Sequence, residues 1–479
     1  MERLQPSGID VLVVGAGIGG LSAAIELWRK GHDVRVIEAK DGIAGLGDFV
    51  GIGVSATRQF AKWLGTSEHY DKICYKPALS LYTYEGELFG GPWPARRIDA
   101  VPTPVSRPSL IRLLYDLAVS VGVKFCFGQK VVEYYEDSDG VKFCFGQKVV
   151  EYYEDSDGGR AGVLTASGAH HYAELVVAAD GVGSRSSKIV MGNDSPPRSS
   201  GFAVYRVAFP TAIAHQDKEV ATNFPVPTDG SDDVRIYLGP NTHAITIVSE
   251  KIITWLLTHE DKGHSAESWS STVNASDVIQ ELAKDPSWDP RLLALIKQTP
   301  DQSTVDWKLM WRNANPTWAS PGMRIIQLGD AAHTFLPTSA NGATQAVEDG
   351  ISLASCLHLA GKDNIALGLR VHNHLRFQRV SCCQRAGFKN REQWHHVDLK
   401  EARKHPEKLA EMTGRWITSH DPEEYAYQNW TNCVNHLIRG TEFVNTNIPP
   451  GFSYRPWTID ELLNAADEGR VVDDDGDWS

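Results

Sequence analysis

The chain has 479 residues, of which 42% are hydrophobic and 22% are charged, and its formal net charge is −13. This length suggests two or three domains with the composition of a globular protein, and the negative charge disfavours nucleic acid and anionic membrane surfaces as partners. The seven cysteines show neither a CxxC motif nor metal-ligand spacing, which favours reduced thiols, no metal site and a cytoplasmic location.

The first predicted elements form a strand–turn–helix–strand unit. The apolar run 11–14 leads into a glycine-rich turn, GAGIGG, over 15–20. A predicted helix over 21–30 and a second strand over 33–39 follow. The stretch 9–28 is apolar enough to resemble a signal peptide or a membrane span, but it carries Asp10 and Glu26 and is rich in glycine, so we expect neither. This order of elements is the fingerprint of a dinucleotide site.

Individual residues of this unit have distinct predicted roles. Gly15 permits the tight turn, Gly17 lets a pyrophosphate approach the backbone, and Gly20 lets the helix pack closely on the strand. Glu38, at the end of the second strand, can accept hydrogen bonds from both ribose hydroxyls of an adenosine. Because its charge would repel a 2′-phosphate, the site favours FAD or NAD over NADP.

An 18-residue stretch, VKFCFGQKVVEYYEDSDG, occurs twice without a change, at 123–140 and 141–158. Identity argues against an old solenoid and indicates a recent tandem duplication or an error in the gene prediction. We expect 123–128 to enter the parallel sheet and 148–154 to begin a meander of strands that ends at Asp180. The segment of roughly 129–147 would then be surplus.

Two further predicted strands end in acidic turns. The predicted strand 174–178 is followed closely by Asp180-Gly181. The predicted strand 324–328 is followed by Gly329-Asp330. An acid at such a position can hold a polyol chain such as the ribityl of a flavin. A helix predicted to begin just after Gly342 would direct its positive end towards the same place.

The region between these two turns contains segments in which apolar and polar residues alternate, which is typical of an antiparallel sheet. Strands are predicted there at 201–209, 234–238 and 243–248, and together with the earlier segment 78–84 we expect them to form one antiparallel sheet. Arg206 and Tyr237 lie on two of them. Polar residues on strands usually face water, so a surface arginine and a half-buried tyrosine are the alternative interpretation of this pair.

The motif 15–20 with Glu38, Asp180-Gly181 and Gly329-Asp330 together resemble the class A flavoprotein monooxygenases, the family of para-hydroxybenzoate and salicylate hydroxylases. The resemblance covers about residues 9 to 390. The stretch 457–461 (WTIDE) is similar to the ending of family members from fungal natural-product pathways.

The resemblance implies an α/β fold with a Rossmann-type FAD-binding domain, an antiparallel-sheet substrate domain and a helical C-terminal region. It divides the chain into a discontinuous FAD-binding domain (1–75, 106–192 and 322–400), a substrate domain (76–105 and 193–321) and a C-terminal region (401–479).

The resemblance also implies the site residues. FAD would be bound by Gly15, Gly17, Gly20, Glu38, Gly51, Arg107, Asp180, Gly329, Asp330, Gly342 and Ala343. Arg206 and Tyr237 would be the catalytic pair that holds an anionic oxygen of the substrate. His333 matches a family histidine that does not act as a base, so we expect it to be structural.

The implied function is that of a single-component FAD-dependent monooxygenase. NAD(P)H reduces the FAD, O₂ adds at C4a, and the hydroperoxide hydroxylates or epoxidises a small aromatic or polyketide-like substrate. A flavin halogenase is disfavoured because the chain has no WxWxIP stretch. An FAD-dependent oxidase or dehydrogenase of a secondary metabolite, and a non-enzymatic escort protein with a flavoprotein fold, stay open as alternatives.

Overall fold

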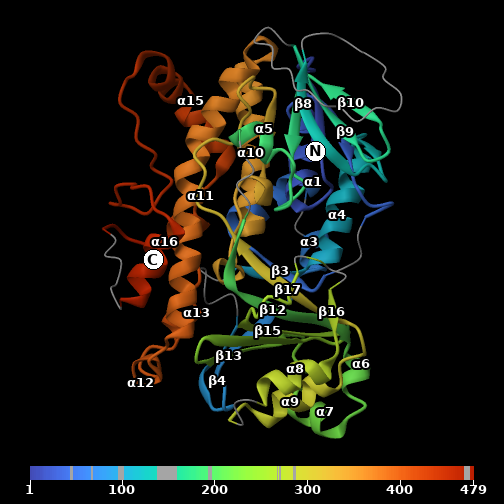
Figure 1. Cartoon of the computed structure of the whole chain (residues 1–479), viewed down its shortest axis with the longest axis vertical. Helices are drawn as coiled ribbons and strands as arrows, with labels where there is room; N and C mark the ends of the chain where they lie inside the picture. The colour runs from blue at the N-terminus through green and yellow to red at the C-terminus, as the bar shows by residue number, and fades with distance from the viewer. Residues whose placement is uncertain are drawn as a thin grey trace.

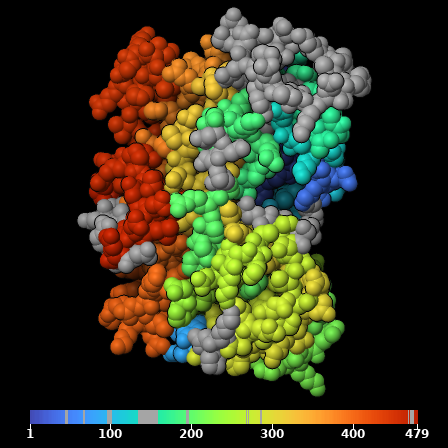
Figure 2. Space-filling view, in the orientation of Figure 1, coloured from blue at the N-terminus to red at the C-terminus, as the bar shows by residue number. Residues whose placement is uncertain are grey.

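The computed structural model describes residues 1–43, 47–65, 68–94, 102–137, 159–192, 197–266, 268, 271–283, 287–468 and 475–479. Two sheets lie one above the other, with helices packed around the upper sheet and a long helix, α11, running beside both (Figure 1). The C-terminal segments gather along the outer side of this helix (Figure 2). Among the described residues, no helix is both long and apolar enough to cross a membrane.

The upper sheet is parallel, as the sequence predicts. Its strand order in the described part of the chain is β18-β11-β1-β2-β7. The strands are β1 (Asp10–Val14), β2 (Asp33–Ile37), β7 (Lys124–Cys126), β11 (Leu175–Ala178) and β18 (Ile325–Gln327). The central strands are almost wholly apolar because helices cover one face and a small second sheet covers the other.

The helices on this sheet pack closely against one another. They are α1 (Ile18–Arg29), α2 (Val54–Leu64), α3 (Glu68–Asp71), α4 (Arg107–Ser120), α5 (Ser187–Met191) and α10 (Gly342–Ala360). A side chain at Gly350 of α10 would lie 2.8 Å from the backbone of Ala23 in α1. Glycine at this position therefore sets how near the two helices approach.

The small sheet has the order β10-β9-β8. Its strands are β8 (Val131–Asp137), β9 (Arg160–Thr165) and β10 (His170–Ala173).

The structure uses the first copy of the repeat. Our expectation that 123–128 enters the parallel sheet agrees with β7, but β8 also belongs to the first copy. The prediction that 129–147 is surplus is therefore wrong for residues 131–137, and 148–154 lies outside the described residues. Because the copies are identical, the sequence could not decide between them, and the first copy reaches the sheet directly from β7.

The lower sheet has the order β16-β17-β12-β15-β14-β13-β4-β5. Its strands are β4 (Pro77–Thr83), β5 (Leu88–Pro94), β12 (Arg198–Pro210), β13 (Asp232–Gly239), β14 (Thr242–Val248), β15 (Ile252–Glu260), β16 (Thr272–Val273) and β17 (Thr304–Trp311). All neighbours are antiparallel except β13 and β4, which run parallel. The far face is covered by α6 (Thr211–Ala214), α7 (Lys218–Asn223), α8 (Ala275–Leu282) and α9 (Pro290–Lys297).

The remaining elements join the two sheets. A two-stranded ladder of β3 (Phe49–Ile52) and β6 (Thr103–Ser106) lies between them. The C-terminal helices are α11 (Ile365–His395), α12 (Leu399–Ala402), α13 (Glu407–Ala410), α14 (Arg415–Thr418), α15 (Pro422–Arg439) and α16 (Ile459–Asp467). Short 3₁₀ turns are η2 (Gly329–Ala331), η3 (Pro337–Ser339) and η4 (Lys362–Asn364). α16 begins at a capping box between Thr458 and Glu461.

Deletion of residues 141–158 should leave the fold and FAD binding intact and should preserve or improve soluble yield. Asp137 of β8 pairs with Arg160 of β9, and the deletion would join them through the four residues Ser138-Asp139-Gly140-Gly159. A short glycine-containing loop of this kind closes an antiparallel pair well. Far-UV circular dichroism and the FAD content of the purified protein check this. Loss of bound FAD in the shortened chain would show that the second copy is functional.

Candidate functional site

A cavity of about 870 Å³ lies between the carboxyl ends of the parallel strands and the inner face of the lower sheet. Its wall includes the turn after β1, the end of β2, the turns after β11 and β18, and the first residues of α10. Ligands of open α/β sheets bind at this edge because the strand ends and helix N-termini meet there. The cavity continues over strands β12, β13, β14 and β15 of the lower sheet.

The glycine-rich turn has the geometry that a pyrophosphate requires. Gly15 has φ +101°, and a side chain there would lie 2.5 Å from the carbonyl oxygen of Ala179. A side chain at Gly20 would collide with the Gly15 carbonyl, so Gly20 serves packing and does not line the cavity. A side chain at Gly17 would meet no atom within 4 Å. Its absence leaves open space at the N-terminus of α1.

Glu38 lies at the end of β2 with its carboxylate fixed by the backbone. One oxygen accepts from the N–H of Ala16 at 2.8 Å, and the other accepts from the N–H of Lys40 at 3.0 Å. An ionised carboxylate can accept about four hydrogen bonds. These two bonds therefore orient the Glu38 carboxylate and leave it able to accept further hydrogen bonds from a ligand. Glu38 lines the cavity beside Gly17, where it can meet the hydroxyls of a ribose.

Asp330 projects into the cavity from a 3₁₀ turn after β18. Gly329 before it has φ +60°, a conformation that favours glycine. The Asp330 side chain is open to the cavity, while protein surrounds it on the other sides. This burial raises its pKa above the ordinary value, although His333 and Arg107 act in the opposite direction.

Arg107 begins α4 and also lines the cavity. Its pKa is lowered, first by burial and then by the positive charge of Arg206, whereas Asp48 and Asp330 oppose this shift. The backbone N–H of Arg107 donates to the carbonyl of Asp48 at 3.0 Å. Arg107 is thus close enough to Arg206, Asp48 and Asp330 for their charges to act on it.

The Asp48–Arg206 ion pair was not predicted from the sequence. Asp48 is 4% exposed, and both of its carboxylate oxygens accept from Arg206, with the Nε donor at 2.8 Å. Arg206 lies on the cavity face of β12. The pair joins the segment before β3 to the lower sheet, and an acid just before a short strand gave no signal of this role.

Tyr237 lies on the wrong face of the sheet for the role that the sequence suggested. Its neighbour Ile236 lines the cavity, whereas Tyr237 is 0% exposed within the core between the sheet and helices α8 and α9. Its ring stacks on Tyr82 at a centroid distance of 5.2 Å. Since side chains alternate along a strand, Tyr237 cannot contact a ligand in the cavity, and its predicted catalytic role is withdrawn.

The first turn of α10 completes the wall. Gly342 and Ala343 line the cavity, as does Ala340, whose φ of +47° is unusual for a residue with a side chain. Such backbone strain is found mostly where a site needs a particular chain path. Gly51 of β3 and Asp180 after β11 also line the cavity, so every residue predicted to bind FAD except Gly20 borders it.

The part of the cavity over the lower sheet is mainly apolar. Its lining side chains are Leu79, Val234, Ile236, Ile245, Ile247, Leu256, Trp394 and Met412. His243 is the polar exception on β14, and its Nδ1 lies 3.2 Å from Nε2 of His395. Burial lowers the pKa of His243 well below its usual value, and that of His395 to about 4. Both rings are therefore neutral at pH 7.

This cavity fits FAD: an open glycine turn, an oriented acid at a strand end and a second acid beside a helix N-terminus lie along one wall. Residues 100–364 match the FAD binding domain family, and residues 13–49 match the NAD(P)-binding Rossmann-like domain family. The chain is 37% identical over its whole length to FAD-dependent monooxygenase fsr3 of Gibberella fujikuroi (strain CBS 195.34 / IMI 58289 / NRRL A-6831), covering 91% of that protein.

The chain belongs to the FAD-dependent monooxygenases. Two solved structures agree with this assignment. FqzB is 28% identical with a TM-score of 0.80, over 94% of this chain and 98% of that one. The structure of CtdE in complex with FAD and substrate 4 is 27% identical with a TM-score of 0.77, over 90% and 99% of the two chains. The cofactor of this monooxygenase is FAD.

Replacing Asp330 with alanine should weaken FAD binding in the monooxygenase. The variant loses a carboxylate that borders the cavity beside the α10 N-terminus, and one lost charged hydrogen bond corresponds to about a tenfold or larger rise in the FAD Kd. Release of FAD fluorescence on dilution of the purified protein measures this. Asp306→Ala, which removes a buried carboxylate on β17 outside the cavity wall, is the matched control. An unchanged Kd in Asp330→Ala would remove Asp330 from the FAD site.

Proposed function

We propose that this monooxygenase uses NAD(P)H and O₂ to hydroxylate or epoxidise an uncharged aromatic or polyketide-like substrate. The observation that carries the proposal is the continuity of one cavity from the FAD-binding wall to the apolar chamber over the lower sheet. A substrate in that chamber would lie next to the cofactor without crossing solvent. Bound FAD supplies the electron transfer and oxygen activation.

The chamber favours a substrate recognised mainly by shape. Its floor consists of aliphatic side chains from β13 and β14, and Trp394 and Met412 close it from the side of α11. Burial of a planar apolar ring system against such residues contributes about 25 cal/mol for each Å² removed from water. An apolar enclosure also keeps water away from reactive species during oxygen transfer.

Two polar groups in this region can orient the substrate. His243 is neutral, with Nδ1 near His395 and Thr258, so its Nε2 edge suits a hydroxyl or carbonyl. Arg206 is already paired with Asp48, and that pairing neutralises its charge. The pair therefore favours a neutral or hydrogen-bonded oxygen over a fully charged carboxylate, which refines the role that the sequence suggested for Arg206.

The function is tested by adding phenols, indoles and polyenes to the FAD-loaded protein and following NAD(P)H oxidation together with product mass. We expect a substrate-dependent increase in NAD(P)H oxidation and a product that gains one oxygen atom from isotopically labelled O₂. Hydrogen peroxide equal to all the NAD(P)H consumed, whatever the substrate, would instead favour an oxidase. A purified protein without FAD would favour the escort-protein alternative.

Arg206→Gln combined with Asp48→Asn should impair turnover more than FAD binding. The double variant avoids leaving a buried charge unpaired, which would confuse the result with a loss of stability. Lost substrate orientation should lower kcat/KM on the order of a hundredfold, with the FAD Kd changed by less than about threefold. Tyr237→Phe is the control, because Tyr237 faces away from the cavity, and its kcat/KM should stay at the wild-type value. Wild-type kcat/KM in the double variant would contradict the role of Arg206.

A further inference from the structure

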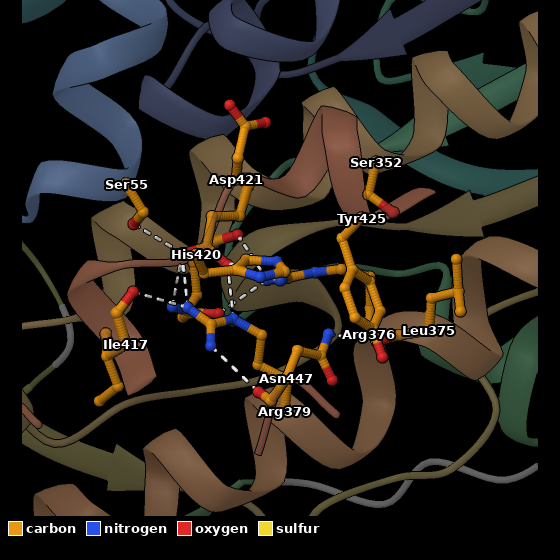
Figure 3. A network of polar contacts seen from close by, with 12 residues as sticks. Ser55, Ser352, Leu375, Arg376, Arg379, Ile417, His420, Asp421, Tyr425 and Asn447 are labelled. Carbon is orange, nitrogen blue, oxygen red and sulfur yellow. Dashed lines mark hydrogen bonds and ion pairs between the residues drawn. The ribbon is translucent and has the colours of Figure 1, made fainter. Parts of the chain in front are cut away.

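A network of buried polar contacts joins α10, whose first residues line the cavity, to α11 (Figure 3). Glu348 and Asp349 are consecutive on α10, and Arg376 and Arg379 are one turn apart on α11. The four side chains are each at most 1% exposed. Buried charges are costly unless they are paired and hydrogen-bonded. The contacts of these four residues form two branches: the Asp349 branch reaches the turn at Asp330, and the Glu348 branch reaches α2 and the C-terminal region.

The Asp349 branch leads to the cavity. One carboxylate oxygen accepts from Nε of Arg376 at 2.9 Å. The other accepts from Nε2 of His333 at 2.6 Å and from the backbone N–H of Gly329 at 3.2 Å. His333 and Gly329 flank Asp330. Asp349 therefore ties both ends of the turn that carries Asp330 to the core of the protein.

The Glu348 branch leads away from that turn. Its carboxylate accepts from Arg376 at 2.6 Å, from Nε of Arg379 at 2.8 Å and from the Ser55 hydroxyl at 2.7 Å. Arg379 in turn donates to backbone carbonyls of the C-terminal region, namely those of Trp416, Ile417 and Asn447. Glu348 thus joins α10 to α2 and to the C-terminal segments.

The turn at Asp330 depends on such support from outside. It is a three-residue 3₁₀ turn, and Gly329 has a positive φ. Short turns of this kind have little stability of their own. Within the turn, the N–H groups of Ala332 and His333 both donate to the carbonyl of Gly329, but the N–H of Gly329 itself is held by Asp349.

We propose that Asp349, held by Arg376, is a positioning residue for FAD, because it fixes the Gly329–His333 turn so that the Asp330 carboxylate faces the cofactor. This role concerns cofactor binding and does not depend on which substrate is oxidised. Burial alone would raise the pKa of Asp349, but His333 and Arg376 outweigh burial and hold that pKa well below its usual range. The carboxylate is thus charged at neutral pH, as two opposed sets of donors require.

The experiment compares Asp349→Asn with Glu348→Gln. Each variant removes one buried negative charge next to Arg376 without changing the side-chain size, so both should lower the melting temperature. An asparagine at 349 turns one acceptor into a donor, which then faces either Arg376 or the donors of the turn. We expect the FAD Kd, measured by fluorescence on dilution of the FAD-loaded protein, to rise about tenfold or more in Asp349→Asn but less than about threefold in Glu348→Gln.

A second pair of variants tests the same claim without removing a buried charge. His333→Gln keeps an N–H donor close to the place of Nε2, whereas His333→Leu removes it. We expect His333→Gln to keep the wild-type FAD Kd and visible circular dichroism of the bound flavin, and His333→Leu to lose affinity and change that spectrum. Equal FAD Kd values within both pairs of variants would overturn the proposal, since a purely structural role changes stability alone.

Discussion

The pairing of Glu348 and Asp349 with Arg376 and Arg379 is the interaction on which the rest of the structure depends. It joins α10, whose first turn faces the cavity, to α11, which runs beside both sheets. Removing one partner of such a buried pair typically costs about 3–5 kcal/mol, because the remaining charge is left unpaired. Helices α10 and α11, the C-terminal region and the turn at Asp330 are therefore held to one another by charges that water does not reach.

The cavity that this framework encloses has two chemically different parts. The wall near the parallel sheet offers backbone N–H groups, open space beside glycines and the three acids Glu38, Asp180 and Asp330, which suits the charged and hydroxylated parts of FAD. The wall near the lower sheet is aliphatic and aromatic, with the neutral His243 as its histidine. The Asp48–Arg206 pair stands on the boundary.

Local patterns predicted the parts of the site that are built locally. The glycine turn with Glu38 and the turn at Asp330 depend on a few consecutive residues whose backbone geometry restricts the residue type. The predicted catalytic role of Tyr237 was wrong because the sequence did not show which face of β13 meets the cavity. Both faces of β13 are buried, so hydrophobicity could not show which face meets the cavity, and a shift of one residue reverses the answer.

The partners of Asp48 and His243, and the choice between the two copies of the repeat, could not be predicted from the sequence. Asp48 and His243 gain their roles from partners 158 and 152 residues away, Arg206 and His395. The choice between the two copies of the repeat has no sequence signal, because identical segments have identical propensities. In each case the missing information is a long-range contact, which local pattern does not contain.

The central claim is that one cavity holds the FAD and the substrate side by side, and a crystal structure of the FAD-loaded protein tests it most directly. The account predicts a pyrophosphate at Gly17, a ribose at Glu38, the ribityl chain at Asp330 and the flavin ring at the mouth of the chamber formed by Ile236 and Trp394. A flavin ring that points away from this chamber, or FAD bound outside the cavity, would contradict the account.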